Sequence, residues 1–180
     1  MSQLRTKLDR FNKPSEVVYR HLKFVIMDSP SEQNISQYVK ELQRARVTNL
    51  VRACEPHYNN KSMEDVGIVC NAMEFQDGDP PSDEIIKKWL DLCKETFGEL
   101  YQSSSKYKEP MSGIAVHCVA GLGRAPVLVA IALIEAGMEP YGAIQYIREK
   151  RRGAINEKQI RFLEEYVPSR KGNGCGCALQ

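Results

Sequence analysis

The stretch from His117 to Pro126 combines a cysteine, two glycines and an arginine at a spacing that could bind a phosphoryl group and attack it. It follows the apolar run that begins at Gly113, which is typical of a buried strand. Glycines let successive backbone amides point inward as an anion-binding nest, and the start of a helix adds positive potential. Arg124 would add a planar, two-pronged donor for phosphate oxygens. Because the same field favours the thiolate of Cys118, this loop would bind a phosphoryl group and activate a nucleophile together.

Two plainer interpretations stay open from the residues alone. A buried cysteine and an arginine at a helix start could flank an ordinary tight turn. Gly121-Leu122-Gly123 is also similar to part of a dinucleotide-binding turn, although Pro126 stands where that motif needs its last glycine. The combination of a strand, a His-Cys pair, a loop and an arginine-led helix favours the phosphate-binding interpretation.

Strands and helices alternate along the chain, which predicts an α/β fold with a central, mostly parallel sheet flanked by helices. Asn156 and Gln159 predict a capping box at the last helix. We expect a flexible basic N-terminus at residues 1–14, one domain at 15–168 and a flexible tail at 169–180, with Ser103 to Lys106 as a loop. The apolar patterns predict strands near residues 17–19, 22–26, 47–53, 68–73 and 113–117, and helices near 33–45, 85–97, 124–136, 139–150 and 156–166.

Composition excludes several classes of protein. The 180 residues include 25 Lys and Arg against 23 Asp and Glu, and 42% are hydrophobic. This balance is typical of a globular protein and too even for a nucleic-acid binder, so we expect no nucleic-acid partner. The longest apolar run, Val127 to Ile134, is far shorter than the roughly 18 residues of a membrane span, and residues 1–7 show no secretory signal. The six cysteines and three histidines fit neither a disulfide framework nor a zinc site, so we expect no metal and no cofactor.

The signature His-Cys-x5-Arg belongs to cysteine-dependent protein phosphatases, and a longer match is more specific. H-C-V-A-G-L-G-R-A-P-V-L-V-A, with K-R-R-G-A-I-N further on, closely resembles the phosphatases of regenerating liver, the type IVA protein tyrosine phosphatases, over about Val17 to Tyr166. The resemblance implies a small dual-specificity phosphatase fold that hydrolyses phosphotyrosine or other phosphomonoesters, on protein or phosphoinositide. Cys118 would form a phosphocysteine. Its phosphate oxygens would be held by the loop Val119, Ala120, Gly121, Leu122, Gly123 and Arg124.

This chemistry also needs an acid for the leaving oxygen. The segment Phe75-Gln76-Asp77-Gly78-Asp79-Pro80-Pro81 follows a predicted strand, and its match to the family's Asp-Gly-x-Pro-Pro segment implies Asp77 as the general acid. Gln76 stands where the family commonly carries a second Asp, and Asp79 is the rival acid on the same loop. Similarity to related phosphatases also implies that His117 orients the loop through hydrogen bonds.

Ala125 follows the arginine, where most cysteine phosphatases carry a Ser or Thr whose hydroxyl helps the thiolate leave during hydrolysis. Because an alanine side chain cannot donate a hydrogen bond, we predict slow turnover and a long-lived phosphocysteine. The family that the chain resembles also typically carries an alanine at this position. The family therefore implies an alternative function, in which the pocket binds a CNNM-type magnesium transporter through an acidic loop and catalysis is incidental.

Cys54 ends the strand predicted at 47–53, and the carboxyl ends of parallel strands gather at one edge of a sheet, so we expect it to face Cys118. The family resemblance implies a reversible disulfide between these two cysteines, with an inert core cysteine as the alternative. We expect Cys70 and Cys93 to lie in the core.

Cys177-Ala178-Leu179-Gln180 fits the C-a-a-X motif for prenylation, and the last Gln favours a farnesyl group. A protein with a single lipid chain binds membranes weakly, and this sequence has little that would serve as a second membrane-binding feature. Arg170 and Lys171 stand upstream, and Cys175 is either a palmitoyl acceptor or a free thiol. Lys150-Arg151-Arg152 either attracts anionic lipid or partners, or is a solvated helix end. Together with the properties of the family that the chain resembles, these features imply a protein on the cytoplasmic face of plasma and endosomal membranes, with a soluble cytosolic fraction. The resemblance also implies that the protein can form homotrimers.

Overall fold

The sheet at the centre of the molecule sets the strand that ends at His117 between two parallel neighbours. A computed structural model of the chain describes residues 10–102 and 109–169. The strands are β1 (Ser15–Tyr19), β2 (Leu22–Met27), β3 (Val47–Arg52), β4 (Val69–Ala72) and β5 (Gly113–His117), paired in the order β1-β2-β5-β3-β4. β1 joins β2 as an antiparallel hairpin, whereas β2, β5, β3 and β4 are parallel to one another. The prediction of an α/β fold with a mostly parallel sheet is confirmed.

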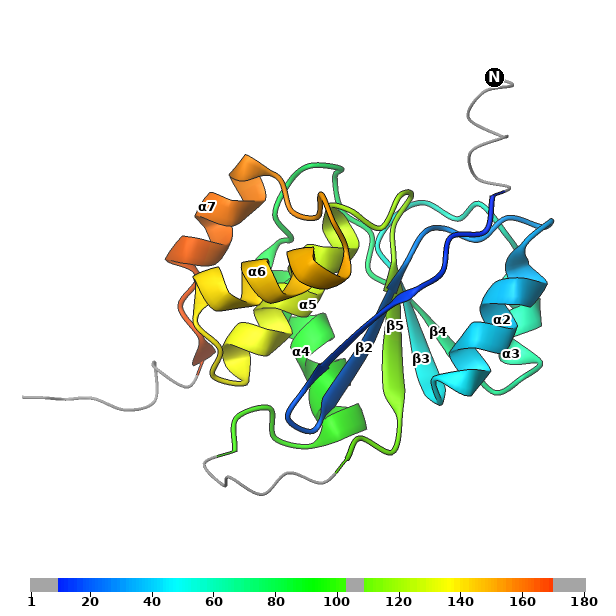
Figure 1. The fold of residues 1–180 in the computed structure, drawn as a ribbon, viewed down its shortest axis with the longest axis horizontal. Helices are drawn as coiled ribbons and strands as arrows, with labels where there is room; N and C mark the ends of the chain where they lie inside the picture. Colours follow the sequence, from blue (N-terminus) through cyan, green and yellow to red (C-terminus); the bar gives the residue numbers. More distant parts are fainter. Residues whose placement is uncertain (1–9, 103–108, 170–180) are drawn as a thin grey trace, which may run out of the picture.

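Helices lie on both sides of the sheet (Figure 1). One side carries α4 (Asp83–Phe97), α5 (Arg124–Glu135), α6 (Pro140–Lys150) and α7 (Glu157–Glu165), and the other carries α2 (Ile35–Arg44) and α3 (Lys61–Glu64). The predicted helices are confirmed to within a few residues at each end. α3 was not predicted, because a single helical turn is too short to show an apolar period.

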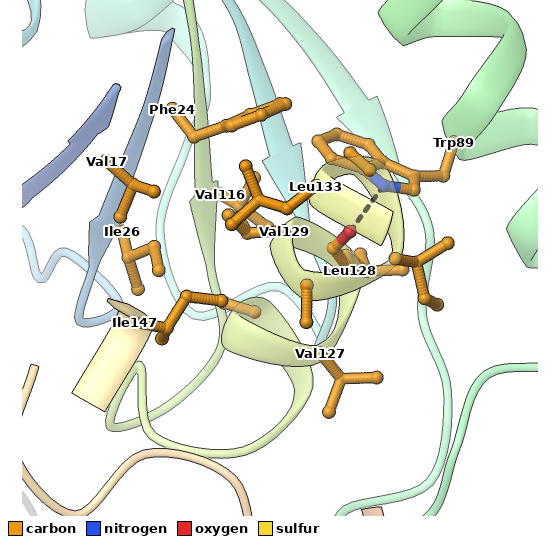
Figure 2. Packing of buried hydrophobic residues seen from close by; sticks show 14 of the residues in the cluster. Val17, Phe24, Ile26, Trp89, Val116, Val127, Leu128, Val129, Leu133 and Ile147 are labelled. Atoms are coloured by element: carbon orange, nitrogen blue, oxygen red, sulfur yellow. Dashed lines mark hydrogen bonds between the residues drawn. The ribbon is translucent and has the colours of Figure 1, made fainter. Parts of the chain in front are cut away.

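Helix α5 is apolar on all sides, and every one of its residues is buried. Such a helix must be surrounded by protein. The indole Nε1 of Trp89, on α4, donates to the carbonyl oxygen of Leu128 at 2.6 Å, and the Trp89 ring packs against Phe24 of β2 with centroids 5.6 Å apart (Figure 2). Because α5 begins at Arg124, this packing fixes the start of the helix relative to the end of β5.

Two helices begin with the side-chain caps that satisfy their first backbone amides. The side-chain oxygen of Asn156 accepts from the amide of Gln159 at 2.9 Å, and Gln159 Oε1 accepts in return from the amide of Asn156 at 3.1 Å. This is the predicted capping box of α7. Ser82 caps α4 by accepting from the amide of Ile85 at 3.4 Å.

Two residues of the segment predicted to be flexible, Phe11 and Asn12, contact helix α2, whereas residues 1–9 lie outside the described residues. Phe11 packs edge-on against Tyr38 of α2, with ring centroids 5.0 Å apart. The amide of Asn12 donates to the Tyr38 hydroxyl at 3.4 Å. Residues 11 and 12 therefore pack against the body of the protein, three residues before β1 begins at Ser15.

The predictions for the two core cysteines and for the remaining segments differ in how they agree with the structure. Cys93 is buried in the core as predicted, whereas Cys70 is only half-buried because β4 is an edge strand. The loop predicted at Ser103 to Lys106 lies outside the described residues. Among the helices that the structure describes, none is both long and apolar enough to cross a membrane.

Candidate active site

The candidate catalytic residues lie where β5 ends and α5 begins. Cys118 is the first residue after β5 and is 3% exposed, and the loop that follows it leads into Arg124. The turn depends on Gly121, whose φ of +62° lies in the left-handed region. A Cβ atom there would lie 2.6 Å from the carbonyl oxygen of Met27 and 2.5 Å from Nη2 of Arg151. Any larger residue would push the loop away from β2.

The carbonyl oxygens of this loop point to donors outside it. The pairs are Ser29 N to Val119 O (3.0 Å), Arg151 Nη2 to Ala120 O (3.0 Å), Arg151 Nε to Gly121 O (2.7 Å) and Ile155 N to Leu122 O (2.7 Å). With the carbonyls turned outward, the loop amides are left unpaired: no described residue accepts a hydrogen bond from the amides of residues 119–124. Unpaired amides beside the start of a helix form a site for an anion.

Arg124 brings a buried positive charge to the same place. Its side chain is only 5% exposed, and Nη1 donates to the carbonyl oxygen of Phe75 at 3.2 Å. Nε lies 3.2 Å from Oδ1 of Asp77 as an ion pair, although it is not aligned for a hydrogen bond with any described residue. A guanidinium with one edge anchored and the other free of hydrogen bonds is suited to hold an oxyanion.

The structure separates the two aspartates that compete for the role of general acid. Asp79 pairs with Lys158 of α7, with Nζ and Oδ1 2.6 Å apart. Asp77 instead approaches Arg124, and its side chain is 74% exposed. Asn156 Nδ2 holds the loop between them by donating to the carbonyl oxygen of Gly78 at 3.1 Å. Asp77 is therefore the aspartate at the phosphate-binding loop, and its role as the acid stays a prediction.

His117 is fully buried beneath the loop and is held from both sides of its ring. Nδ1 lies 3.3 Å from the carbonyl oxygen of Cys118, and Nε2 lies 2.8 Å from the hydroxyl of Tyr58. Burial lowers the pKa of His117 to about 3, so the ring is neutral at physiological pH. Since a carbonyl can only accept, the single ring proton belongs on Nδ1, and Nε2 accepts from Tyr58. Tyr58 was not predicted, because nothing in its loop marks it as a partner of a strand far along the chain.

Cys54 follows β3 and lies at the same sheet edge as Cys118. The amide of Ala53 donates to the carbonyl oxygen of His117 at 2.8 Å, which ties the ends of β3 and β5 together. Both cysteines are buried free thiols. Burial raises the pKa of Cys54 to about 11; a charge on Cys118 also raises it, and Arg124 lowers it. The predicted juxtaposition of the two cysteines fits this geometry, and the disulfide stays a prediction.

A cleft of about 260 Å³ opens beside the loop, and its charge is mixed. Buried Arg124 lies at its floor, while the surrounding walls carry three carboxylates, of which Glu74 pairs with Arg52 at 3.2 Å. The cleft is lined by Cys54, Glu55, Glu74, Phe75, Gln76, Asp77 and Arg124. A bound phosphoryl group would meet one cation at the floor and carboxylates at the rim.

The side chain of Arg151 is largely buried, although the basic residues beside it suggest an exposed position. The run Lys150-Arg151-Arg152 was expected to face lipid, partners or solvent, but the side chain of Arg151 is only 10% exposed and turns inward to the loop. Arg152 is exposed. No local pattern predicts this contact, because Gly121 lies 30 positions away along the chain. Cys175 and Cys177, the predicted lipid acceptors, lie outside the described residues.

The chain is similar to known phosphatases over most of its length. The sequence profile of the family described as protein-tyrosine phosphatase matches residues 17–167. Protein tyrosine phosphatase type IVA 3 of Mus musculus is 46% identical over 164 residues, 90% of each chain. The PRL-1 phosphatase of Drosophila melanogaster is 42% identical over 173 residues, 93% of each chain. A solved structure of a protein tyrosine phosphatase from Leishmania major superposes with a TM-score of 0.73 at 38% identity, covering 87% of this chain and 99% of that one.

Proposed function

We propose that this chain, which belongs to the protein-tyrosine phosphatase family and within it to the type IVA group, hydrolyses phosphomonoesters slowly through a phosphocysteine on Cys118. It is a protein-tyrosine phosphatase by family. The observation that carries the mechanism is the loop itself, whose carbonyls are turned outward around a buried cysteine and whose amides donate to no residue that the structure describes. A phosphoryl group is the ligand that suits this arrangement.

Each of the site residues has a separate role in the first chemical step. The thiolate of Cys118 attacks phosphorus, and the bond from phosphorus to the leaving oxygen breaks as the S–P bond forms. The loop amides and Arg124 hold the three other phosphate oxygens as negative charge builds on them. Asp77, at the mouth of the site, gives its proton to the leaving oxygen. In the second step water attacks phosphorus, Asp77 takes the proton of that water, and the thiolate leaves.

The second step is the slow one in this proposal. Ala125 is the second residue of α5, next to Arg124, and it is completely buried. Its methyl group offers no proton or hydrogen bond to the departing thiolate of Cys118. The phosphocysteine therefore accumulates, and release of phosphate limits turnover.

The walls of the cleft favour one substrate class. A phosphoinositide headgroup carries several negative charges and would meet Glu55, Glu74 and Asp77 at the rim. A phosphotyrosine with cationic neighbours would place positive charge against the same carboxylates. We therefore infer that the substrate is a phosphorylated protein.

The alternative function is that of a binding regulator, and Ala125 is the observation that favours it. A protein that releases phosphate this slowly is a poor catalyst, and in this alternative its pocket serves mainly to hold a partner while catalysis is incidental. The partner that the family implies is a CNNM-type magnesium transporter, and its acidic loop would have to pass the carboxylates at the rim. Retention of partner binding and of the cellular effect in Cys118→Ser would make binding the biological role.

We also propose that the chain works at membranes. This proposal is supported by the C-a-a-X sequence at Cys177 and by the family of the chain. A farnesyl group would bring the protein to the cytoplasmic face of plasma and endosomal membranes, and a single lipid would leave a soluble fraction. Homotrimers are a further proposal with the same support.

Phosphopeptide hydrolysis tests the enzymatic proposal. Reduced protein is incubated with two phosphotyrosine peptides that differ only in having Lys or Glu beside the phosphotyrosine, and phosphate release is followed. We expect release from the Lys peptide to be faster, and no release by Cys118→Ser. Hydrolysis of a phosphoinositide in vesicles at a higher kcat/KM than either peptide would contradict the inferred substrate class, and release by Cys118→Ser would contradict the nucleophile.

A further inference from the structure

Arg151 uses every donor that its side chain has. A guanidinium carries five N–H groups, and the structure provides five acceptors for them. Nε donates to Gly121 O (2.7 Å), and Nη2 donates to Ala120 O (3.0 Å) and to Oδ1 of Asp28. The longer bonds from Nη1 go to Ser15 Oγ and Ile26 O, both at 3.5 Å. The side chain therefore links the end of α6 to β1, to β2 and to the phosphate-binding loop.

Asp28 sets the direction of this guanidinium. It follows directly after β2 and is ion-paired with Arg151, and the two side chains are 18% and 10% exposed. Its other oxygen, Oδ2, accepts from Nδ2 of Asn12 at 2.5 Å. Hydrogen bonds between charged groups that are shielded from water are stronger than neutral ones, and the paired carboxylate leaves the fork of Arg151 one favoured orientation.

The consequence for the loop follows from the two carbonyls that Arg151 holds. A peptide unit is planar, so a carbonyl that is turned outward turns the amide of the next residue the other way. Holding Ala120 O and Gly121 O therefore orients the amides of Gly121 and Leu122. These lie in the middle of the loop, where no described residue accepts from them. Lysine could not replace this fork, because an ammonium is a point donor without fixed parallel N–H bonds.

We propose that Arg151, held by Asp28, is a positioning residue that orients the central amides of the phosphate-binding loop. It touches no reacting atom in this role and acts through Gly121 and Ala120. The proposal rests on the proposed function, since it concerns the binding of a phosphoryl group by the same loop. It is distinct from a general effect of positive charge, because neighbouring Arg152 carries the same charge and is exposed.

Oxyanion binding separates this role from a structural one. Arg151→Gln, Arg151→Lys and the control Arg152→Gln are compared for tungstate affinity, for kcat and KM on an aryl phosphate, and for thermal unfolding. Misplacing binding groups by about 1 Å can cost roughly 10²-fold, so we expect Arg151→Gln to lose about that much in kcat/KM and to bind tungstate more weakly. Arg151→Lys should recover thermal stability through Asp28 but not tungstate affinity. Arg152→Gln should leave tungstate affinity unchanged.

Each contrary outcome has one meaning. Tungstate affinity and kcat/KM within twofold of wild type in folded Arg151→Gln would overturn the proposal, as would full recovery of tungstate affinity in Arg151→Lys. If Arg151→Gln does not fold, Asp28→Asn decides instead: it keeps the shape of the side chain and removes the charge, and unchanged tungstate affinity in it would equally overturn the proposal. If wild-type protein neither binds tungstate nor hydrolyses the aryl phosphate, the proposed function fails, which is a different result from any of these.

Discussion

The carboxylate of Asp77 is ion-paired with the guanidinium of Arg124, with Oδ1 3.2 Å from Nε. Nη1 of that guanidinium donates to the carbonyl oxygen of Phe75, so the edge formed by Nε and Nη2 donates no aligned hydrogen bond to the described residues and suits a ligand. A phosphoryl oxygen and the Asp77 carboxylate therefore compete for the same donor. The exposed carboxylate would have to leave Arg124 before it can reach the leaving oxygen of a substrate.

This competition predicts opposite effects of Asp77→Asn on binding and on rate. Without the negative charge, tungstate should bind up to about fivefold more tightly, which is the range of a weak, exposed ion pair. The kcat on a phosphotyrosine peptide should fall by roughly 10²–10⁴, because the amide can neither give a proton to the leaving oxygen nor take one from the water that attacks in the slow second step. Asp79→Asn is the matched control, because Asp79 pairs with Lys158, and it should change neither value. Weaker tungstate binding in Asp77→Asn would refute the competition.

Ala125→Ser should speed the second chemical step. A hydroxyl at this buried position can donate to the departing thiolate, and a hydrogen bond to a charged group contributes about 1.5 kcal/mol or more, near tenfold in rate. Single-turnover measurement of phosphoenzyme decay gives the rate directly. Ala130→Ser, also buried in α5, controls for the insertion of a hydroxyl into this helix. An unchanged decay rate in Ala125→Ser would remove the explanation for slow turnover.

Peroxide should join Cys54 and Cys118. The thiolate of Cys118 reduces peroxide and becomes a sulfenic acid, and the thiolate of Cys54 then attacks that sulfur and displaces hydroxide. Because burial raises the pKa of Cys54 to about 11, its thiolate fraction at neutral pH is small, and this second step should quicken as pH rises from 7 to 9. Intact mass without reductant should show the loss of two hydrogens.

Two variants locate that disulfide. Cys54→Ser should stop the loss of hydrogens, whereas Cys93→Ser should not, since Cys93 is buried elsewhere in the core. A sulfenic acid that persists in wild-type protein, with no loss of hydrogens at any pH, would mean that Cys54 is an inert core cysteine.

His117 should make the protein less stable in mild acid. Its pKa is about 3 in the folded protein against 6.5 for an ordinary histidine, so between these values the unfolded chain binds the proton and the folded chain does not. The free energy of unfolding should therefore fall with pH below 6.5, by about 1.4 kcal/mol per pH unit from this group. Denaturant titrations at pH 6.5 and 5 measure the slope.

The comparison that isolates His117 is its replacement by glutamine. His117→Gln should show a smaller loss of stability between pH 6.5 and 5, by about 2 kcal/mol, whatever its stability at pH 6.5. Replacement of the exposed His57 should not reproduce this change. Equal slopes in wild type and His117→Gln would show that His117 is already protonated or is not buried in solution.

The fold was predictable because its signals are local. Alternating apolar runs mark the strands, Asn156 and Gln159 mark the start of α7, and the glycine-rich turn after His117 marks the loop. Cys118 and Arg124 could be found in the same way, because both lie in one short motif between the end of a strand and the start of a helix. The short connection of β1 to β2 fits an antiparallel hairpin, and the helices between the later strands fit a parallel orientation, whereas the order of the strands was not predicted.

The supports of the site were not predictable, because they come from distant segments. Tyr58 lies 59 positions before His117, and Arg151 lies 123 positions after Asp28. A tyrosine in a loop and an arginine in a basic run look like solvated residues until the fold brings them to the loop. The segment match implied Asp77 over Asp79 as the general acid, but no spacing in the sequence reveals that Asp77 approaches Arg124 while Asp79 pairs with Lys158.

The measurement that tests the central claim most directly is rapid mixing of reduced protein with excess aryl phosphate, with product release and intact mass followed together. We predict a burst of product equal to the amount of protein, a phosphate adduct on the Cys118 peptide during the slow phase, and neither in Cys118→Ser. Steady product release without a burst or adduct would contradict a phosphocysteine that breaks down slowly. Absence of both product and adduct in wild-type protein would contradict the enzymatic function itself.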